Sequence, residues 1–329
     1  MRGEVIMCAT NIKYIDGMPF KAITYPFNKP DSMVIENIKL EQSVNYINSK
    51  KINKAYIKGV YNYNFLKGCK GIKHLSIEFQ LSMADYSVLE KKGKYYWVDY
   101  DLSSIYDLNE LKSLQFINNE NPDIRAKAQL DVSELSTLEM YKGEYSFVKN
   151  IEKAERMRML ELYKYDGIDL NDFGKLKNLI TLQVVSSKLQ SLNGCEMFDN
   201  MQCIYLHYNR NISNISSLGK IKHSLKALRI ENCPKIEDFS VLNELENLEL
   251  LELSGSNSLP NLQFLKKMKH LKTFTFNMNV EDGDLSLCKD LTYVYCEKNR
   301  KHYNLKDKEF PKEQYFRGNE NIEEWLRLE

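Results

Sequence analysis

A short apolar pattern that returns about every 22 residues constrains this 329-residue chain more than any other feature. In one copy, apolar residues fall at Leu248, Leu251 and Leu253, which is a step of three followed by a step of two. The same unit begins at Ile52, Ile72, Gly93, Leu111, Leu135, Met157, Leu179, Met201, Leu225, Leu248, Leu271 and Leu291. Self-similarity at such a period predicts a solenoid of stacked coils, in which each coil contacts only its neighbours.

Each half of the unit has a physical reading. The step of two places Leu251 and Leu253 on one face of a short strand. Further apolar residues precede the unit at intervals of three, a spacing that suits one side of a 3₁₀-like segment. Asn, Cys or Ser often follows three residues after the last apolar position, as at Asn209 and Cys233. We expect such a side chain to turn the chain inward and to bond the neighbouring coil, because an unpaired buried amide is destabilising.

These units resemble the leucine-rich repeat, whose consensus is L-x-x-L-x-L-x-x-N/C, over roughly residues 43–300. The repeat length and the apolar residues at intervals of three before each unit look most like the bacterial internalin-type class. The resemblance implies an α/β fold, namely a right-handed, curved solenoid with a parallel β-sheet on its concave face. Short 3₁₀, irregular or helical segments would form the convex side. The first units depart from the pattern, since Ala55 and Gly93 replace leucines.

The two ends of the chain lack the repeat, so we divide it into three parts. Residues 1–42 are predicted to form an N-terminal cap, in which Glu4–Cys8 and Lys21–Tyr25 could pair as strands. Residues 43–301 are the repeat array of about 12 repeats. Residues 302–329 are predicted to be a C-terminal cap with a short helix over Asn319–Leu328. Caps are expected because the terminal coils of a solenoid would otherwise expose their apolar faces.

Composition excludes several classes of protein. Lys and Arg total 46 against 45 Asp and Glu, so a general nucleic-acid binder, with its basic surplus, is not expected. No apolar stretch approaches the roughly 20 residues that span a bilayer, and the first residues lack the apolar core of a signal peptide. The expected location is therefore the cytoplasm, without a membrane partner. Seven cysteines, none in a CxxC pair, are expected to be reduced core residues.

No pattern of residues points to catalysis. The sequence contains no phosphate-cradling loop, no Ser-His-Asp or Cys-His arrangement and no metal-ligand spacing. We therefore predict no catalytic residues, no metal, no cofactor and no small-molecule substrate.

The concave face is the predicted working surface. In each strand the residues that flank and separate the last two apolar positions should point out of the core and align into three columns. These positions hold seven acids and three bases. Glu139 and Glu161 are predicted to be neighbours, with Tyr141 and Tyr163 as a second adjacent pair. The residues predicted to bind a partner are Tyr95, Trp97, Glu139, Tyr141, Glu161, Tyr163, Tyr205 and His207.

Two function hypotheses follow from this surface. The first is a non-enzymatic, monomeric scaffold whose concave face binds a protein partner that carries basic residues. An immunity protein that neutralises a basic toxin is one role of that kind. The second is a secreted or surface protein that contacts a host, like the internalins, and its discriminators would be a signal peptide and a surface anchor.

Overall fold

The computed structural model describes residues 11–14, 19–24, 30–37, 39–79, 89–118 and 124–315. The chain forms two compact units, Met1–Asn150 and Ile151–Glu329, and each is described by itself. We call them unit 1 and unit 2.

Unit 1 begins with antiparallel strands and then changes to parallel pairing. Strands β1 (Asn11–Tyr14), β2 (Lys21–Thr24) and β3 (Pro30–Ile35) are antiparallel neighbours, and the predicted strand at Lys21 is confirmed as β2. Helix α1 (Leu40–Lys50) spans the predicted boundary at residue 42 and returns the chain, so that β3 pairs in parallel with β4. The predicted strand Glu4–Cys8 lies outside the described residues. The parallel strands that follow are β4 (Lys54–Lys58), β5 (His74–Glu78), β8 (Ser113–Ile117) and β11 (Met140–Glu144).

The repeat predicted at Gly93 is not a coil of the solenoid. Strand β5 pairs directly with β8, and the chain between them contributes to a separate sheet. That sheet consists of β6 (Glu90–Lys92), β7 (Tyr95–Asp99) and β9 (Ile124–Lys127). Gly93, with a φ of 63°, takes the first position of the tight turn between β6 and β7, where a left-handed conformation favours glycine.

The repeat predicted at Leu135 is displaced by three residues. Tyr141 pairs with Leu114 and Lys142 with Gln115, so the unit starts at Leu138. Gly143 occupies the position of the second core residue, and the Tyr141 ring fills the space that a larger side chain would take. A Cβ atom added to Gly143 would lie 2.6 Å from the Tyr141 hydroxyl. The sequence pattern missed this register because a glycine stands where an apolar residue was expected.

Aromatic rings fill much of the interior of unit 1. The Phe79 ring centroid lies 4.7 Å from that of Tyr100, 5.2 Å from Phe116 and 5.1 Å from Phe147. These rings take the place of the leucines that a regular repeat would supply, and aromatic pairs at such distances add to the stabilisation from burial. The outer side of unit 1 carries short elements, which are η1 (Asn64–Gly68), η3 (Ser103–Asp107), β10 (Leu130–Asp131), η4 (Val132–Glu134), η5 (Tyr145–Phe147) and β12 (Val148–Lys149).

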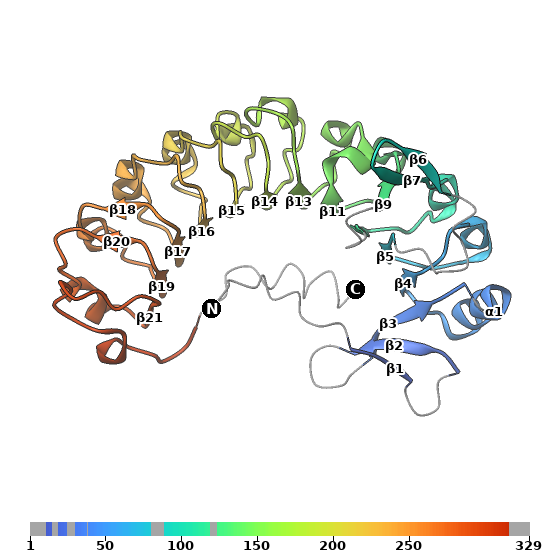
Figure 1. Ribbon diagram of the computed structural model, residues 1–329, viewed down its shortest axis with the longest axis horizontal. Helices are drawn as coiled ribbons and strands as arrows, with labels where there is room; N and C mark the ends of the chain where they lie inside the picture. The colour runs from blue at the N-terminus through green and yellow to red at the C-terminus, as the bar shows by residue number, and fades with distance from the viewer. Residues whose placement is uncertain are drawn as a thin grey trace. The chain divides into compact units, whose positions relative to one another are not determined.

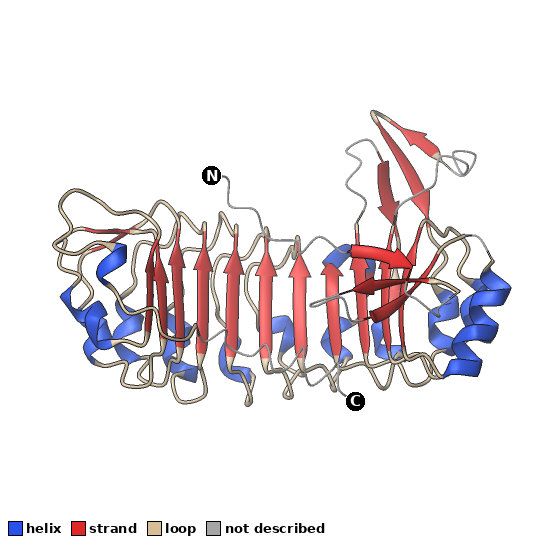
Figure 2. Cartoon of the chain, turned by 90° about the horizontal axis from the view of Figure 1, so that it is seen from below, coloured by secondary structure: helices blue, strands red, loops and turns tan. Residues whose placement is uncertain are grey.

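Unit 2 follows the predicted repeat closely. Its parallel strands lie side by side with all arrows in one direction, as Figures 1 and 2 show. They are β13 (Met159–Tyr163), β14 (Thr181–Val185), β15 (Cys203–His207), β16 (Ala227–Glu231), β17 (Leu250–Ser254), β19 (Thr273–Phe276) and β21 (Tyr293–Cys296).

Two apolar ladders run through the core of unit 2 in the predicted register. One passes from Leu251 to Phe274 and the other from Leu253 to Phe276, and all four side chains are buried. The rings of Phe274 and Phe276 stack with their centroids 4.8 Å apart. Burial of each large apolar side chain contributes about 1.5–3 kcal/mol. The predicted core of this unit is thereby confirmed.

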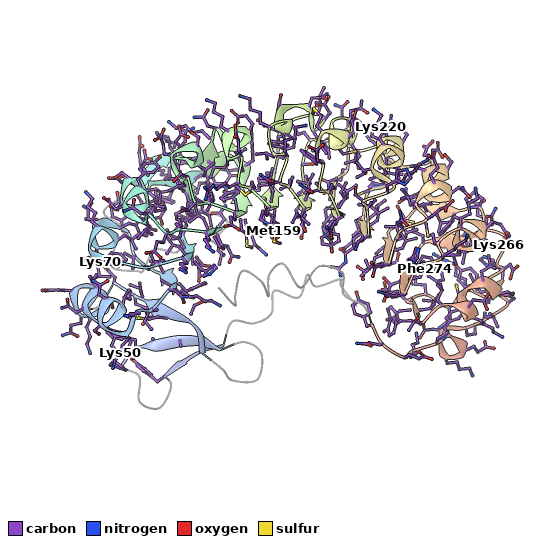
Figure 3. The ribbon with its side chains drawn as sticks, turned by 180° about the vertical axis from the view of Figure 1, so that it is seen from behind. Lys50, Lys70, Met159, Lys220, Lys266 and Phe274 are labelled. Carbon is purple, nitrogen blue, oxygen red and sulfur yellow. The ribbon has the colours of Figure 1, made fainter. Side chains whose placement is uncertain are left out.

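The outer side of unit 2 consists of short 3₁₀ turns, several of which begin with the same local hydrogen bond. An Asp or Asn side chain accepts from the backbone N–H two residues later, as Asp238 does from Ser240 at 2.8 Å. This local bond competes with regular helix and starts a tight turn. Lys220 and Lys266 lie on this outer side (Figure 3). The outer elements are η6 (Ile151–Lys153), η7 (Asn171–Phe173), η8 (Cys195–Met197), η9 (Ser216–Ile221), η10 (Ser240–Glu244), β18 (Ser258–Leu259), η11 (Gln263–Lys266), β20 (Asn279–Val280) and η12 (Ser286–Asp290).

The asparagine position of the repeat bonds the preceding coil, as predicted. Asn209 is fully buried, and its Nδ2 donates to the carbonyl oxygen of Val184 at 2.8 Å. Its Oδ1 accepts from the Ser187 backbone N–H at 2.9 Å and from the Ser187 hydroxyl at 2.5 Å. One side chain thus satisfies three polar groups of the neighbouring coil.

The last described residues cover the edge of the sheet of unit 2. After η13 (Asp307–Glu309), Lys312 pairs antiparallel with Tyr293 of β21. The Val294 backbone N–H donates to the Pro311 carbonyl oxygen at 3.0 Å. The helix predicted over Asn319–Leu328 lies outside the described residues.

Candidate functional site: the inner face of unit 2

The inner face of unit 2 is the side of its strands that points away from the core. The cross-strand register aligns its side chains in rows, as Tyr205, Arg229 and Glu252 are aligned. Four carboxylates stand on this face against one guanidinium. The middle and last positions of the strands carry Glu161, Tyr163, Gln183, Val185, Tyr205, His207, Arg229, Glu231, Glu252, Ser254, Thr275, Asn277, Tyr295 and Glu297.

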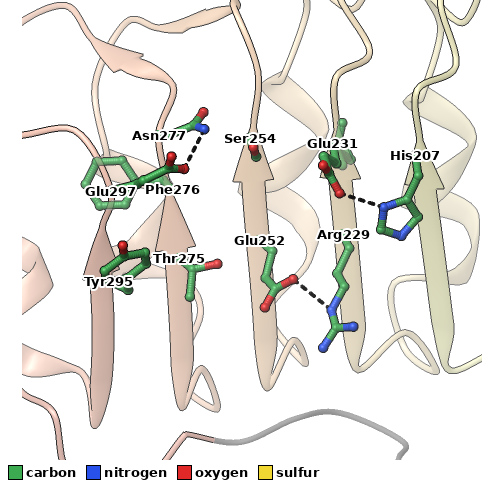
Figure 4. Close-up of a pocket in the computed structure, with 11 residues that line it drawn as sticks. His207, Arg229, Glu231, Glu252, Ser254, Thr275, Phe276, Asn277, Tyr295 and Glu297 are labelled. Carbon is green, nitrogen blue, oxygen red and sulfur yellow. Dashed lines mark hydrogen bonds and ion pairs between the residues drawn. The ribbon is translucent and has the colours of Figure 1, made fainter. Parts of the chain in front are cut away.

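A hollow of about 180 Å³ lies on this face between β15 and β21 (Figure 4). Three of the four carboxylates line it, together with one histidine, one arginine and one exposed tyrosine ring. Its lining residues are His207, Arg229, Ile230, Glu231, Glu252, Ser254, Thr275, Phe276, Asn277, Tyr295 and Glu297.

Arg229 is held between a carboxylate and a ring. Its Nε lies 2.8 Å from Glu252 Oε2, and its guanidinium lies 4.7 Å from the ring centroid of Tyr205. Burial is the largest single influence and acts to lower the pKa of Arg229, but the charges of Glu252 and the neighbouring tyrosines together outweigh it and raise that pKa. Tyr205 is only 8% exposed, so its ring acts mainly as a support for Arg229.

The other two carboxylates of the hollow are also held in place. His207 Nδ1 lies 2.8 Å from Glu231 Oε2, and the Asn277 amide donates to Glu297 at 2.8 Å. The hydrogen bond from His207 lowers the pKa of Glu231 despite its partial burial. Both carboxylates are therefore oriented by their neighbours, and oriented carboxylates recognise cationic groups.

The predicted residues Glu161 and Tyr163 form a pair on β13. The Tyr163 hydroxyl donates to Glu161 Oε1 at 2.5 Å. Glu161 is only 3% exposed, whereas Tyr163 is partly exposed. Burial raises the pKa of Tyr163, and the charge of Glu161 adds to the effect. Tyr163 is the member of this pair that a partner could reach.

The structure corrects two of the predicted site residues on β11 and in the segment before it. Tyr141 is 0% exposed, and its hydroxyl donates to the carbonyl oxygen of Glu144 at 2.8 Å inside unit 1. It is a core residue, so its predicted place on the binding face was wrong. Glu139 precedes β11, and the middle inner position of that strand belongs to Lys142. The prediction that Glu139 and Glu161 are neighbours depended on the sequence register, which the structure displaces by three residues on β11.

Tyr95 and Trp97 lie on β7, away from the solenoid sheet in which they were predicted. The Arg125 guanidinium lies 4.3 Å from the ring centroid of Tyr95. Trp97 pairs with Glu90 on one side and with Arg125 on the other. The prediction that Tyr95 and Trp97 align with residues of the inner strands is therefore wrong, because β6, β7 and β9 form a separate sheet.

Among the described residues of unit 1, lysines balance the carboxylates on the inner face. Lys54, Lys58 and Lys142 stand on it with Glu78 and Glu144. Lys58 Nζ lies 3.3 Å from Glu78 Oε1, and Glu78 also accepts a hydrogen bond from the Tyr56 hydroxyl. The acidic excess that the sequence predicted for the whole array is thus concentrated on unit 2.

Sequence reasoning placed Arg229, Glu231, Glu252 and Glu297 in the columns but did not single them out. Summing the charges of the columns over the later repeats alone would have found them. Tyr315 also belongs to the site, because its hydroxyl donates to Glu252 Oε1. No local pattern could have revealed that contact, which joins residues 63 positions apart.

We also searched the described part of the chain for metal-binding groups and membrane-spanning helices. Within it, no group of three or more His, Cys, Asp or Glu side chains could hold a metal ion. None of its helices is long and apolar enough to cross a membrane.

The repeating strand, the 3₁₀ turn opposite it and the bonded asparagine have the architecture of a leucine-rich-repeat solenoid. No protein-family model matches the sequence, and no curated protein matches it. Among solved structures, the internalin InlF of Listeria monocytogenes is similar, with 15% identity, a TM-score of 0.49 and coverage of 82% of this chain and 81% of that one.

Two further solved structures are similar over smaller shares of their own length. A leucine-rich-repeat protein of Leptospira interrogans has 18% identity and a TM-score of 0.45, with 84% of this chain and 60% of that chain covered. The functional domain of InlJ from Listeria monocytogenes has 18% identity and a TM-score of 0.41, with 60% and 46% covered.

Proposed function

We propose that this protein is a non-enzymatic scaffold that binds a protein partner through the inner face of unit 2. The observation that carries the proposal is the hollow between β15 and β21, which three oriented carboxylates line. Because oriented carboxylates form charge-assisted hydrogen bonds with cations, the partner would present Lys or Arg side chains to them. Tyr163 and Tyr295 supply partly exposed rings on the same face, and Tyr295 is 44% exposed. Tyrosine is favoured in binding hot spots.

The test compares a charge variant on the inner side of the coil with a charge variant on its outer side. The partner is isolated by affinity capture on the wild-type chain, and its association rate is then measured by surface plasmon resonance. Glu231→Gln with Glu297→Gln should lower the association rate several-fold, roughly the size expected when steering charges are removed. Glu246→Gln removes the same kind of charge at an exposed outer position and should leave the rate unchanged.

Salt dependence and a tyrosine variant distinguish electrostatic steering of association from direct contacts in the complex. The wild-type association rate should fall as salt rises, because exposed charges are screened. Tyr295→Ala should mainly raise the dissociation rate, by about tenfold if the ring contributes a hot-spot contact. Unchanged binding in all inner-face variants would contradict the proposal. The immunity and host-contact roles, the basic partner and the cytoplasmic location stay predictions.

A further inference from the structure

The acidic inner face of unit 2 already holds a ligand-like segment, and that segment belongs to the chain itself. Residues 311–315 follow η13, pair with the edge strand β21 and end with the Tyr315 side chain against Glu252 on the inner face. Lys312 and Tyr315 make the contacts that define this segment, which we call the C-terminal strap.

Lys312 is anchored at the edge of the sheet. Its Nζ lies 2.7 Å from Asp307 Oδ1 and also donates to the Val294 carbonyl oxygen. The same ammonium lies 5.5 Å from the ring centroid of Tyr293 and 5.2 Å from that of Tyr295. A cation over aromatic faces is an attractive arrangement.

Tyr315 reaches the middle of the face. Its ring meets that of Tyr293 edge-on, with centroids 5.2 Å apart, and its hydroxyl donates to Glu252 Oε1. Glu252 stands on β17, two strands inward from β21. The contact of Tyr315 with Glu252 therefore reaches two strand spacings, about 10 Å, across the face from β21.

The same carboxylate thus serves two groups at once. Glu252 Oε2 pairs with Arg229 at 2.8 Å, while Oε1 accepts the Tyr315 hydroxyl. Because Glu252 lines the hollow, the strap occupies part of the surface that a partner would need.

We propose that the C-terminal strap is a displaceable occupant of the inner face, and that the partner binds by replacing it with a segment of the same chemistry. That segment would be an extended peptide with a cation and, three residues later, a tyrosine. This inference rests on the proposed function, because it names the partner's binding element and its regulation at the same site. A partner must displace the strap, so its apparent affinity is lower than that for an unoccupied face.

The test uses the full-length chain and a fluorescein-labelled peptide with the sequence of residues 310–315, followed by fluorescence anisotropy. Removal of the strap's ring in Tyr315→Ala should tighten peptide binding by about tenfold or more, because a tethered occupant competes at an effective concentration near millimolar. Gln314→Ala changes an exposed neighbour in the strap and should bind the peptide as the wild type does. Equal peptide affinity for wild type and Tyr315→Ala, or no binding to either at millimolar peptide, overturns the inference.

A second peptide tests the recognition chemistry. A peptide with Phe in place of Tyr should bind Tyr315→Ala about tenfold more weakly, the effect of losing a hydrogen bond to a charged group. Carbodiimide labelling of Glu252, read by mass spectrometry, should be faster in Tyr315→Ala than in wild type. Equal labelling rates would contradict occupancy even if the peptide binds.

Failure here is distinguishable from failure of the proposed function, since these measurements contain no partner. If the peptide results hold but the isolated partner ignores the inner-face variants, the strap site exists and the scaffold proposal is wrong. If the peptide fails while those variants impair partner binding, the face binds a partner and the strap plays no part.

Discussion

His207 Nδ1 lies 2.8 Å from Glu231 Oε2 on the neighbouring strand, and this contact sets the ionisation of the carboxyl group. The pKa of Glu231 is lowered in the folded protein, so the folded state favours the ionised form. The resulting stabilisation should be present above the pKa of an unfolded glutamate, about 4.3, and should be lost as pH falls through the lowered folded value.

This linkage predicts how His207→Gln responds to pH. The variant should be less stable than wild type at pH 6 by about 1 kcal/mol or less, because both side chains are partly exposed. The difference should shrink below about pH 4, as Glu231 becomes protonated in both proteins. Urea unfolding followed by circular dichroism between pH 3 and pH 6 measures it, and a difference that grows on acidification would contradict the assignment.

Asn209→Ala should be strongly destabilising. The substitution leaves the Val184 carbonyl and the Ser187 N–H without their buried partner, at a cost of about 2–4 kcal/mol. Asn200→Ala is the matched control, because Asn200 is exposed and its amide makes one bond to the Lys177 carbonyl at 3.1 Å. Denaturant unfolding of both variants measures the contrast, and comparable losses would show that burial of Asn209 is unimportant.

Gly143→Ala should be destabilising through its clash with Tyr141. The added Cβ would lie 2.6 Å from the Tyr141 hydroxyl, and forcing a methyl group into a packed core costs about 1–3 kcal/mol. Tyr141→Phe removes that hydroxyl, so the double variant should lose less than the sum of the two single losses. A double-mutant cycle by urea unfolding tests the coupling, and additive losses would mean that the two residues do not share the space.

Ser186→Gly should stabilise the protein slightly. Ser186 is exposed and has a φ of 53°, a left-handed conformation that costs a non-glycine residue about 1–2 kcal/mol. Glycine offsets part of that gain through its greater freedom in the unfolded chain, which leaves a net effect of several tenths of a kcal/mol. Lys188→Gly, at an exposed position without positive φ, should instead destabilise, and thermal unfolding should show midpoints that move in opposite directions.

The described cysteines should react slowly with thiol reagents in the native protein. Burial raises the pKa of Cys69 and Cys233 to about 11 and that of Cys195 and Cys288 to about 12. The reactive thiolate is therefore scarce at pH 8. Labelling with a chromogenic disulfide should be fast only after denaturation, and rapid native labelling at any of these four positions would contradict their burial.

The sequence predicted the fold wherever each coil supplies its own leucines. The ladders through Leu251 and Leu253 are local, because strand and turn lie within one repeat, and the register therefore follows from the spacing alone. At Gly143 the core volume is filled by the ring of Tyr141 two residues earlier, and a pattern of residue types does not encode such an exchange. Tyr95 and Trp97 alternate as strand residues should, but alternation does not say which sheet a strand joins.

The candidate site was predictable only in part. The alignment of Arg229 with Glu252 follows from the repeat. Each coil adds one strand, so equivalent positions of successive repeats pair with each other. The contact between Tyr315 and Glu252 depends on the path of the chain after the last coil. Lys312 sets that path by pairing at the sheet edge, and because the segment lies outside the repeats, the repeat pattern does not predict it.

The direct pairing of β5 with β8 has a consequence for how this chain can diverge. Strands β6 and β7, which come between β5 and β8 in the sequence, form a hairpin of a separate sheet, so its connecting loop belongs to an appendage instead of a rung. The entropy of closing such a loop grows only logarithmically, by about 0.6 kcal/mol for each doubling of length. Insertions or replacements there would leave the register of every later coil unchanged. This segment is therefore where the protein can acquire a new surface, or accept a grafted domain, without redesign of its core.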